Sequence, residues 1–434
     1  MSTTETQVWM DTRLQRVAWL SRQDSKKEFN CLMHYFNEES LGKCFQLIDG
    51  RKAKGLDGVD KSSYGENLTT NIKSLVGRMK MMSYLPGNIK QVLIPKEGEK
   101  NAYRPLGISN FEDKLVQKAM QQVLESIYEP IFLSCSFGFR SGKGCHDALR
   151  ELQKHLYQRP VEAIIDIDLA NFFGSINHKE LEQVLRIKIK DNRLMRYIIR
   201  MLKAGVLVDG ELTISEEGSS QGSICSPVLA NVFAHYVIDL WFEAVVKMRC
   251  RGEVKLVRYC DDMVVAYEYE KDAIRIKGAL GKRLEKFKLK LNEEKTKIVK
   301  FDLNLKNKAT FNFLGFTIYW GTSRNGVKVP KLKTMGKRMC AKLKRVTTWI
   351  KEVRNKYRLK EIWRMLILKL EGHIRYYGVS HNIRAINAFL QHAKDIVFKW
   401  LNRRSQRKSF NWEQFNLFIE ANPLPKARVC HKLF

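Results

Sequence analysis

The stretch Lys255–Tyr267, KLVRYCDDMVVAY, places two adjacent aspartates, Asp261 and Asp262, between two apolar runs. β-Branched and aromatic residues favour strands, whereas adjacent aspartates favour turns because their carboxylates resist burial. We therefore predict a β-hairpin that carries two carboxylates at its tip.

A second strand-like run, Ala163–Leu169, lies upstream and contains Asp166 and Asp168. Side chains alternate between the two faces of a strand, so these two aspartates share one face. If the two strands are neighbours, three or four carboxylates converge, and clustered carboxylates suit Mg²⁺. Two such ions can stabilise the attacking and leaving oxygens of a phosphoryl transfer. The alternative is a solvated acidic turn beside an edge strand.

The charge of the chain predicts a polyanionic partner. Its 434 residues include 77 Lys or Arg against 46 Asp or Glu, a net charge of +31, which favours nucleic acid. Residues 331–408 alone hold 22 Lys or Arg and 4 acids, or +18. Aromatic residues interleaved with these bases are typical of a surface that stacks bases and follows phosphates, the alternative being a solvated face. They are Trp349, Trp363, Tyr376, Tyr377 and Trp400.

The cysteines and the hydropathy of the chain indicate in which cellular compartment the protein is expected. The nine cysteines form no CxxC pair and the nine histidines are scattered, so neither a disulfide framework nor a zinc site is indicated. The N-terminus lacks the apolar core of a signal peptide, and we find no apolar run that approaches transmembrane length. We therefore expect a cytoplasmic protein with no membrane partner.

Periodicity predicts an α+β chain that ends in a basic helical bundle. The predicted strands are residues 89–95, 104–108, 163–169, 297–301 and 311–319. The predicted helices are residues 67–82, 113–128, 177–190, 228–246, 271–288, 334–357, 359–378 and 382–404, with a further helix opening near His146.

The order of eight motifs resembles a bacterial reverse transcriptase of the group II intron lineage. The motifs are KGLDGVD, IPKEGEKNAYRPLGI, SFGFRSGKGCHDA, DIDLANFFGSINH, SSQGSICSPVLANVF, RYCDD, LNEEKTKI and FNFLGF. The resemblance runs from Gly55 to Trp400, although Cys260 stands where members of that lineage commonly have Ala. It implies an α+β right-hand polymerase with fingers, a palm and an α-helical thumb.

The resemblance also implies domain boundaries. We expect an N-terminal helical extension at 1–50, fingers at 51–160, and a palm at 161–325 that contains the YCDD hairpin and part of the fingers. A basic helical thumb follows at 326–408, with a tail at 409–434 to which the sequence assigns no role.

Site residues follow from the motifs by resemblance. Asp168 and Asp261 would bind two Mg²⁺ ions, with Asp262 beside them and the backbone of Leu169 completing the metal shell. Lys295 would be the palm lysine near the leaving pyrophosphate. The alternative for this lysine is an ordinary surface position.

Other motif residues would bind the incoming dNTP. Lys96 and Arg104 match fingertip cations that hold the triphosphate, and Gln221 and Gly222 match the loop that lines the nucleotide. Phe173 matches the bulky gate that crowds a ribonucleotide 2′-hydroxyl, with an ordinary core residue as the alternative.

Among family members, the chain is similar to stand-alone defence-associated reverse transcriptases, particularly type 2. These copy a structured noncoding RNA into cDNA during phage infection. The chain would then hold such an RNA and the RNA–DNA duplex, with thumb residues such as Lys342, Lys344 and Arg345 on the duplex backbone. One alternative is an endonuclease-lacking group II intron maturase that acts in splicing and retrohoming. Another is an inactive RNA-binding scaffold, which the intact aspartates disfavour.

Overall fold

The structure is a computed structural model that describes residues 12–95, 103–208, 211–213, 215–218, 222–304, 309–404 and 410–433. The chain divides into two compact units. Within the described residues, unit 1 combines 12–95, 103–148 and 167–297, and unit 2 combines 149–166 and 298–433, with the gaps already given.

The centre of unit 1 is a helix, α5 (Phe111–Tyr128), that is buried on almost every side. Leu115 and Leu124 are both fully buried, because apolar residues that recur at helical spacing cover its faces. Helices α1 (Thr12–Gln23) and α2 (Glu38–Leu47) pack against it. The predicted helix at 113–128 is therefore confirmed, and it is a core element.

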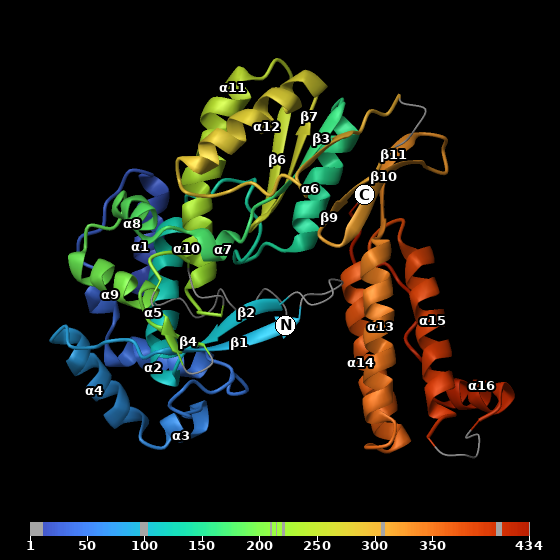
Figure 1. Ribbon diagram of the computed structural model, residues 1–434, viewed down its shortest axis with the longest axis horizontal. Helices are drawn as coiled ribbons and strands as arrows, with labels where there is room; N and C mark the ends of the chain where they lie inside the picture. The colour runs from blue at the N-terminus through green and yellow to red at the C-terminus, as the bar shows by residue number, and fades with distance from the viewer. Residues whose placement is uncertain are drawn as a thin grey trace. The chain divides into compact units, whose positions relative to one another are not determined.

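Unit 1 contains further helices, which are drawn in Figure 1. They are η1 (Met33–Tyr35), α3 (Lys61–Gly65), α4 (Leu68–Lys80), α7 (Phe172–Ser175), α8 (His178–Arg186), α9 (Asn192–Leu202) and α12 (Glu270–Glu285), with the start of α6 (Cys145–Gln158). The helices predicted at 67–82, 177–190 and 271–288 are confirmed as α4, α8 and α12, and α9 was not predicted.

A long apolar helix runs from Ser226 to Arg249. It comprises α10 (Ser226–Ala234), the π-helical segments η2 (His235–Asp239) and η3 (Phe242–Val246), and α11 (Lys247–Arg249). By length and composition it is apolar enough to cross a membrane, so the prediction that no apolar run approaches that length is wrong. However, 67% of its most apolar 18-residue window is buried inside the protein, and α10 packs against α5 and α8. Burial in the core of unit 1 accounts for its apolar composition.

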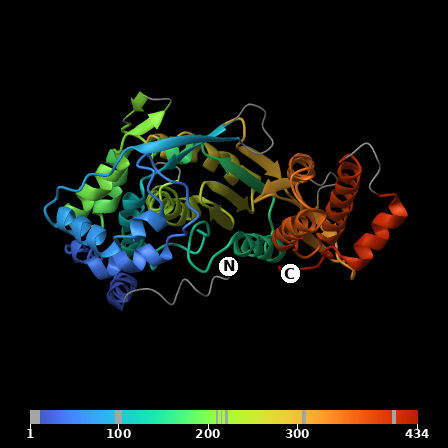
Figure 2. The ribbon, with the colours of Figure 1, turned by 90° about the horizontal axis from the view of Figure 1, so that it is seen from below.

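A four-stranded sheet of unit 1 has the strand order β2-β1-β4-β5. β1 (Ile89–Pro95) and β2 (Tyr103–Ile108) form its long antiparallel pair (Figure 2), with Lys90 opposite Ile108. These strands confirm the prediction at 89–95 and 104–108. The strands β4 and β5 complete the sheet at Val206–Val208 and Glu211–Thr213.

A second four-stranded sheet has the order β6-β7-β3-β8. The strands are β3 (Ala163–Asp168), β6 (Val254–Tyr259), β7 (Asp262–Tyr267) and β8 (Lys297–Lys300). Unit 1 contains β6, β7, the last two residues of β3 and the first residue of β8. Asp166 and Asp168 are both half-buried while Ile167 between them is buried, as the predicted alternation requires.

Unit 2 combines a small sheet with a helical bundle. The sheet has the order β11-β10-β9, with β9 (Phe311–Phe313), β10 (Phe316–Thr322) and β11 (Lys328–Thr334). The bundle helices α13 (Gly336–Val353), α14 (Leu359–Tyr377) and α15 (Ile383–Leu401) lie side by side in both views (Figures 1 and 2), and α16 (Trp412–Ala421) joins their apolar core. The three predicted bundle helices are confirmed, whereas β11 and α16 were not predicted.

Residues 428–431, near the C-terminus, bind to the C-terminal part of α14. The guanidinium of Arg428 pairs with both carboxylate oxygens of Glu371, at 2.6 and 3.2 Å. The N–H groups of Cys430 and His431 both donate to the carbonyl of Gly378, at 2.7 and 2.9 Å. The tail therefore fastens the C-terminal end of α14, a structural role that the sequence did not reveal.

Candidate active site at the β6–β7 turn

The predicted hairpin is confirmed, with a two-residue turn at its tip. Tyr259 pairs with Asp262, which leaves Cys260 and Asp261 as the loop. Cys260 has a φ of +61°, the positive value that two-residue hairpin turns need at the first loop position, where glycine is common. A non-glycine residue in this conformation costs about 1–2 kcal/mol. The surroundings of Cys260 therefore have to hold the turn in place.

Asp261 lies in a partly buried position close to charged neighbours. Burial is the largest influence on its carboxyl group and raises its pKa above the usual range. The positive charge of Arg104 lowers this pKa, and the negative charge of Asp168 raises it. The structure thus brings Asp168, Asp261 and the predicted fingertip cation Arg104 into one electrostatic neighbourhood.

Asp168 is held by the LNEEKT segment of unit 1. The Nδ2 of Asn292 donates to its carboxylate at 3.4 Å, and the Nζ of Lys295 lies 4.0 Å from the other carboxylate oxygen. Its backbone N–H donates to the hydroxyl of Thr296 at 3.2 Å. Lys295 is therefore beside the aspartate with which the sequence grouped it. Leu169 is buried and forms an isolated antiparallel bridge with Leu291, which fixes the end of β3.

The structure gathers fewer carboxylates than the sequence suggested. Throughout the described residues, no group of three or more His, Cys, Asp or Glu side chains is placed to hold a metal ion. Asp262 is the first residue of β7 and is exposed, while Met263 after it is fully buried. The expectation of three or four converging carboxylates is corrected to a pair, Asp168 and Asp261.

The donor chemistry of this pair fits a hard divalent cation. Carboxylate oxygens are the ligands that Mg²⁺ prefers. Burial and the neighbouring charge of Asp168 both disfavour ionised Asp261, and a bound cation would relieve both effects. Asp168 and Asp261 are thus the residues that could hold a metal.

A cavity in unit 1 is lined by Pro105 and Gly174, the chain neighbours of the predicted nucleotide-binding residues Arg104 and Phe173. The cavity has a volume of about 220 Å³ and is lined by residues of β1, β2, α7 and the segment before α10, among them Gly107, Gly174 and Gly218. Phe173 is half-buried beside this lining and meets Phe172 edge-on at 5.7 Å. Phe173 is more exposed than its buried neighbour Phe172, and its role as a gate stays a prediction.

The loop before α10 approaches β2 closely. Gly222 has a φ of +121°, and a Cβ atom on it would collide with the carbonyl oxygen of Gly107, so only glycine fits. The amide oxygen of Gln117 accepts from the N–H of Ile224 at 3.0 Å. The predicted residues Lys96 and Gln221 lie outside the described residues.

With this geometry in place, comparison with known proteins identifies the family. A family model described as "Reverse transcriptase (RNA-dependent DNA polymerase)" matches residues 94–318, more than half of the chain. The chain belongs to the reverse transcriptase family. The match includes both Asp168 and Asp261, and the family has the palm and fingers of a right-hand polymerase, so the predicted α+β polymerase fold and RNA-directed DNA polymerase activity are confirmed.

Relatives of this reverse transcriptase include intron-encoded proteins. The group II intron-encoded protein LtrA of Lactococcus lactis subsp. cremoris is 25% identical over 87% of this chain and 75% of its own length. Protein YkfC of Escherichia coli is 30% identical over 64% of this chain and 78% of its own length. An uncharacterized 91 kDa protein in the cob intron of Schizosaccharomyces pombe is 36% identical over 44% of this chain and 22% of its own length. The predicted likeness to the group II intron lineage is therefore confirmed.

The predicted duplex-binding residues of this reverse transcriptase lie on α13 in unit 2. Lys344 and Arg345 are exposed, and the Nζ of Lys342 lies 4.7 Å from the ring centre of Tyr377. Tyr377 and Trp363 are buried in the unit 2 core. The interpretation of these two aromatics as a base-stacking surface is wrong, because the helical spacing that interleaves them with basic residues also turns them inward.

The other three interleaved aromatics contact cations of the chain itself. Lys369 lies over the ring of Trp349 at 5.1 Å, and Lys342 lies over the ring of Tyr376 at 5.8 Å. Trp400 has three cations over its ring, at 4.5–5.0 Å, from Lys351, Arg354 and Arg403. Trp363 and Tyr377 therefore serve packing, whereas base stacking by the three partly exposed aromatics and duplex contact by the basic side chains stay predictions.

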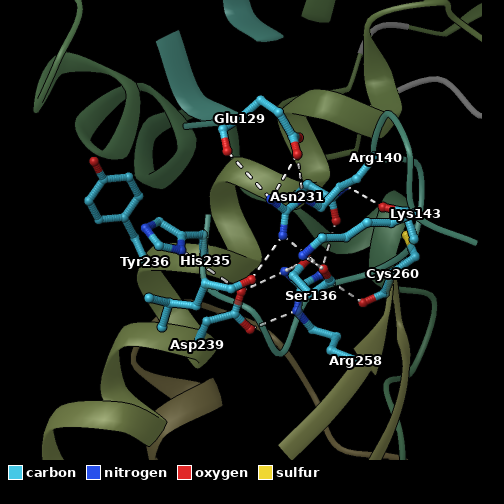
Figure 3. A network of polar contacts seen from close by, with 12 residues as sticks. Glu129, Ser136, Arg140, Lys143, Asn231, His235, Tyr236, Asp239, Arg258 and Cys260 are labelled. Carbon is cyan, nitrogen blue, oxygen red and sulfur yellow. Dashed lines mark hydrogen bonds and ion pairs between the residues drawn. The ribbon is translucent and has the colours of Figure 1, made fainter. Parts of the chain in front are cut away.

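Sequence reasoning missed the polar network beneath the turn (Figure 3). Arg258 and Asp239 form an ion pair in which both side chains are fully buried. The sequence signal was an arginine directly after the apolar residues Leu256 and Val257 of β6, because an arginine is almost never fully buried without a partner.

Proposed function

We propose that this reverse transcriptase adds nucleotides at Asp168 and Asp261, which would hold two Mg²⁺ ions. The observation that carries the proposal is that Asp261 is partly buried near Asp168, so that burial first and the charge of Asp168 second raise the pKa of Asp261. Reverse transcriptases generally use divalent metal ions such as Mg²⁺. When bound, such ions supply charge stabilisation at the attacking 3′-oxygen and the departing pyrophosphate oxygens.

The chain's own residues would bind and orient the substrates. Lys295 and Arg104 bring positive charge to the aspartate pair, as binding of a triphosphate and release of pyrophosphate require. Phe173 would form an apolar wall that has no room for a 2′-hydroxyl. Lys96 and Gln221 stay predicted contacts of the dNTP, Gly222 a predicted part of its wall, and Asp262 and the Leu169 backbone predicted supports of the metal shell.

The charge distribution supports a ribonucleoprotein. Residues 331–408 carry +18 of a net +31, and phosphate contacts by Lys and Arg dominate affinity for nucleic acids. In this proposal the basic thumb at 326–408 binds the RNA–DNA duplex, and residues 51–160 and 161–325 form the fingers and the palm. The remaining excess of positive charge would bind a folded RNA that serves as template.

For the biological role, we propose antiphage defence in the bacterial cytoplasm, with cDNA copied from one dedicated structured noncoding RNA. Support for this role comes from the resemblance to defence-associated reverse transcriptases and from the positive charge available for a folded RNA partner.

The second candidate is an endonuclease-lacking group II intron maturase. A specific observation favours it: the relative that aligns with 87% of this chain carries the description "Group II intron-encoded protein LtrA". Under this reading the resident RNA is the intron that encodes the protein, and the same polymerase site would serve retrohoming.

Recovery of the protein from cells with its bound RNA and cDNA distinguishes the two roles. Sequencing should be done with and without phage, and with the Asp261→Ala variant as a control for cDNA that the protein itself makes. A single short noncoding RNA with its cDNA, and reduced phage plating, support defence. The protein's own spliced intron lariat, without any effect on plating, refutes defence and favours the maturase.

A further inference from the structure

The guanidinium of Arg258 is saturated with hydrogen bonds (Figure 3). Nε and one terminal nitrogen donate to the two carboxylate oxygens of Asp239 at 2.7 and 2.6 Å. The same terminal nitrogen donates to the hydroxyl of Ser136 at 2.8 Å. The other terminal nitrogen donates to the amide oxygen of Asn231 at 3.0 Å and to the carbonyl of Cys260 at 3.1 Å. Arginine has five N–H donors, and all five have an acceptor here.

These partners come from separate parts of unit 1. Asn231 lies in α10, and Asp239 is the last residue of the π-helical segment η2. Ser136 belongs to the loop before α6, and the Nδ2 of Asn231 donates to the carbonyl of Gly138 in that loop at 2.7 Å. Arg258 therefore ties a helix, a loop and the strand β6 to the turn.

The bond to Cys260 reaches the turn through the peptide that joins Cys260 to Asp261. A trans peptide is planar, so its C=O and N–H point in opposite directions. Arg258 holds the carbonyl toward the protein interior, and the N–H on the other side belongs to Asp261. The backbone of Asp261 acts on its own carboxyl group, whose pKa it lowers against the larger effect of burial. The chain of contacts thus runs from Arg258, through one peptide plane, to the carboxylate.

We infer that Arg258 is a positioning residue, which fixes the orientation of the Asp261 carboxylate through the Cys260 carbonyl and so sets the rate of nucleotide addition. The inference rests on the proposed function, in which Asp261 holds a metal ion. The restraint matters because Cys260, which is not glycine, adopts an unfavourable φ of +61° that the turn would otherwise tend to relax.

A purely stabilising role is a distinct alternative with different consequences. Replacing a buried ion pair by apolar residues of similar size is often neutral or stabilising, whereas removing one partner strongly destabilises. The backbone of Arg258 is also fixed independently, since its N–H and C=O bond to Cys135 and Phe137 at 2.8 and 2.9 Å. An apolar replacement of the pair can thus keep β6 in place while leaving the turn without its restraint.

The test compares the double variant Arg258→Met/Asp239→Leu with wild type in the full-length protein. Melting temperature, template–primer Kd, and the rate of single-nucleotide addition across a Mg²⁺ titration are measured. We expect the rate to fall about 10²-fold, the loss typical of a misplaced catalytic group, and half-maximal rate to need more Mg²⁺. Template–primer Kd should change less than threefold.

Two further variants keep the test decisive if the double variant does not fold. Arg258→Lys retains the positive charge beside Asp239 but loses the planar fork of donors, so we expect it to be at least tenfold slower with an unchanged Kd. Ser136→Ala is the matched control, because it removes a bond of the same guanidinium that does not touch the turn. We expect it to lose less than threefold in rate.

Folded Arg258 variants that match wild type in rate and Mg²⁺ dependence overturn the inference. So does a Ser136→Ala variant that is as slow as Arg258→Lys, since the effect would then belong to the network in general. Asp261→Ala is run in parallel to separate the two claims. If it extends primers normally, the proposed metal site has failed; if it is inactive while the Arg258 variants are normal, only the positioning inference has failed.

Discussion

Replacing Gly138 by alanine should slow nucleotide addition without weakening template binding. A Cβ atom at this position would lie 2.5 Å from the backbone nitrogen of Cys260 and 2.9 Å from the carbonyl carbon of Tyr259. Ordinary contacts begin at 3.4 Å, so the loop and the turn must separate by about 0.9 Å. Gly138 is not in the left-handed region, so alanine acts through this contact alone.

The magnitude follows from that displacement. A misplacement of about 1 Å in a catalytic arrangement costs about 10²-fold in rate, and overpacking a well-filled site costs about 1–3 kcal/mol of stability. We therefore expect the Gly138→Ala enzyme to add a single dNTP about 10²-fold more slowly. Its affinity for the template–primer should be that of wild type, because Gly138 contacts the β6–β7 turn, whereas the duplex is proposed to bind the basic thumb.

Single-turnover extension of a primer by one dNTP measures this rate, and fluorescence anisotropy measures template–primer affinity. Gly144→Ala is the matched control, since it lies in the same loop and its Cβ would meet no atom closer than 3.6 Å. A Gly138→Ala rate within threefold of wild type would refute the reasoning. Equal slowing of both glycine variants would also refute it, because the loss would then not come from contact with the turn.

The remaining predictions concern the nucleotide gate, the thumb and a buried histidine. Phe173→Ala should raise incorporation of rNTP relative to dNTP in competition assays, and an unchanged ratio means that discrimination lies elsewhere. Lys344→Glu with Arg345→Glu should flatten the slope of log affinity against log salt by about two charges; an unchanged slope identifies a solvated face. Burial lowers the pKa of His373 to about 3, so the unfolded chain takes up a proton below its ordinary pKa of 6.5 while the folded chain does not. Stability should fall as pH decreases from 6.5 toward 4, by up to about 1.4 kcal/mol per pH unit for this residue, and thermal unfolding of His373→Leu should show a shallower decline.

The sequence was enough to predict those helices and strands whose structure follows from residues close together in the chain. The two apolar runs that flank Asp261 and Asp262 predicted the hairpin, and helical spacing predicted α5 and the three bundle helices. The same spacing was present in α9, where Leu194, Ile198 and Met201 are buried and Asp191 caps the first turn. This helix could therefore have been found from sequence.

Other features depend on partners that are distant in the sequence. From the sequence alone, Arg258 is a charged residue in a predicted strand with no evident role. The structure shows that Asp239 and Ser136 bind its guanidinium. Trp363 and Tyr377 sit among basic residues in sequence but turn into the bundle core. Charge and aromatic content are properties of a segment, whereas burial is a property of one helix face, so composition alone misassigned them.

The most direct test of the account is primer extension on an RNA template by purified Asp168→Ala and Asp261→Ala enzymes. Removal of a metal-binding carboxylate should cost several kcal/mol of transition-state stabilisation, or about 10³-fold or more in rate. Both variants should still bind template–primer with wild-type affinity, and Asp261→Ala should unfold at or above the wild-type temperature, because burial disfavours the ionised carboxylate that this substitution removes. Extension by either variant at a rate near that of wild type would contradict the central claim.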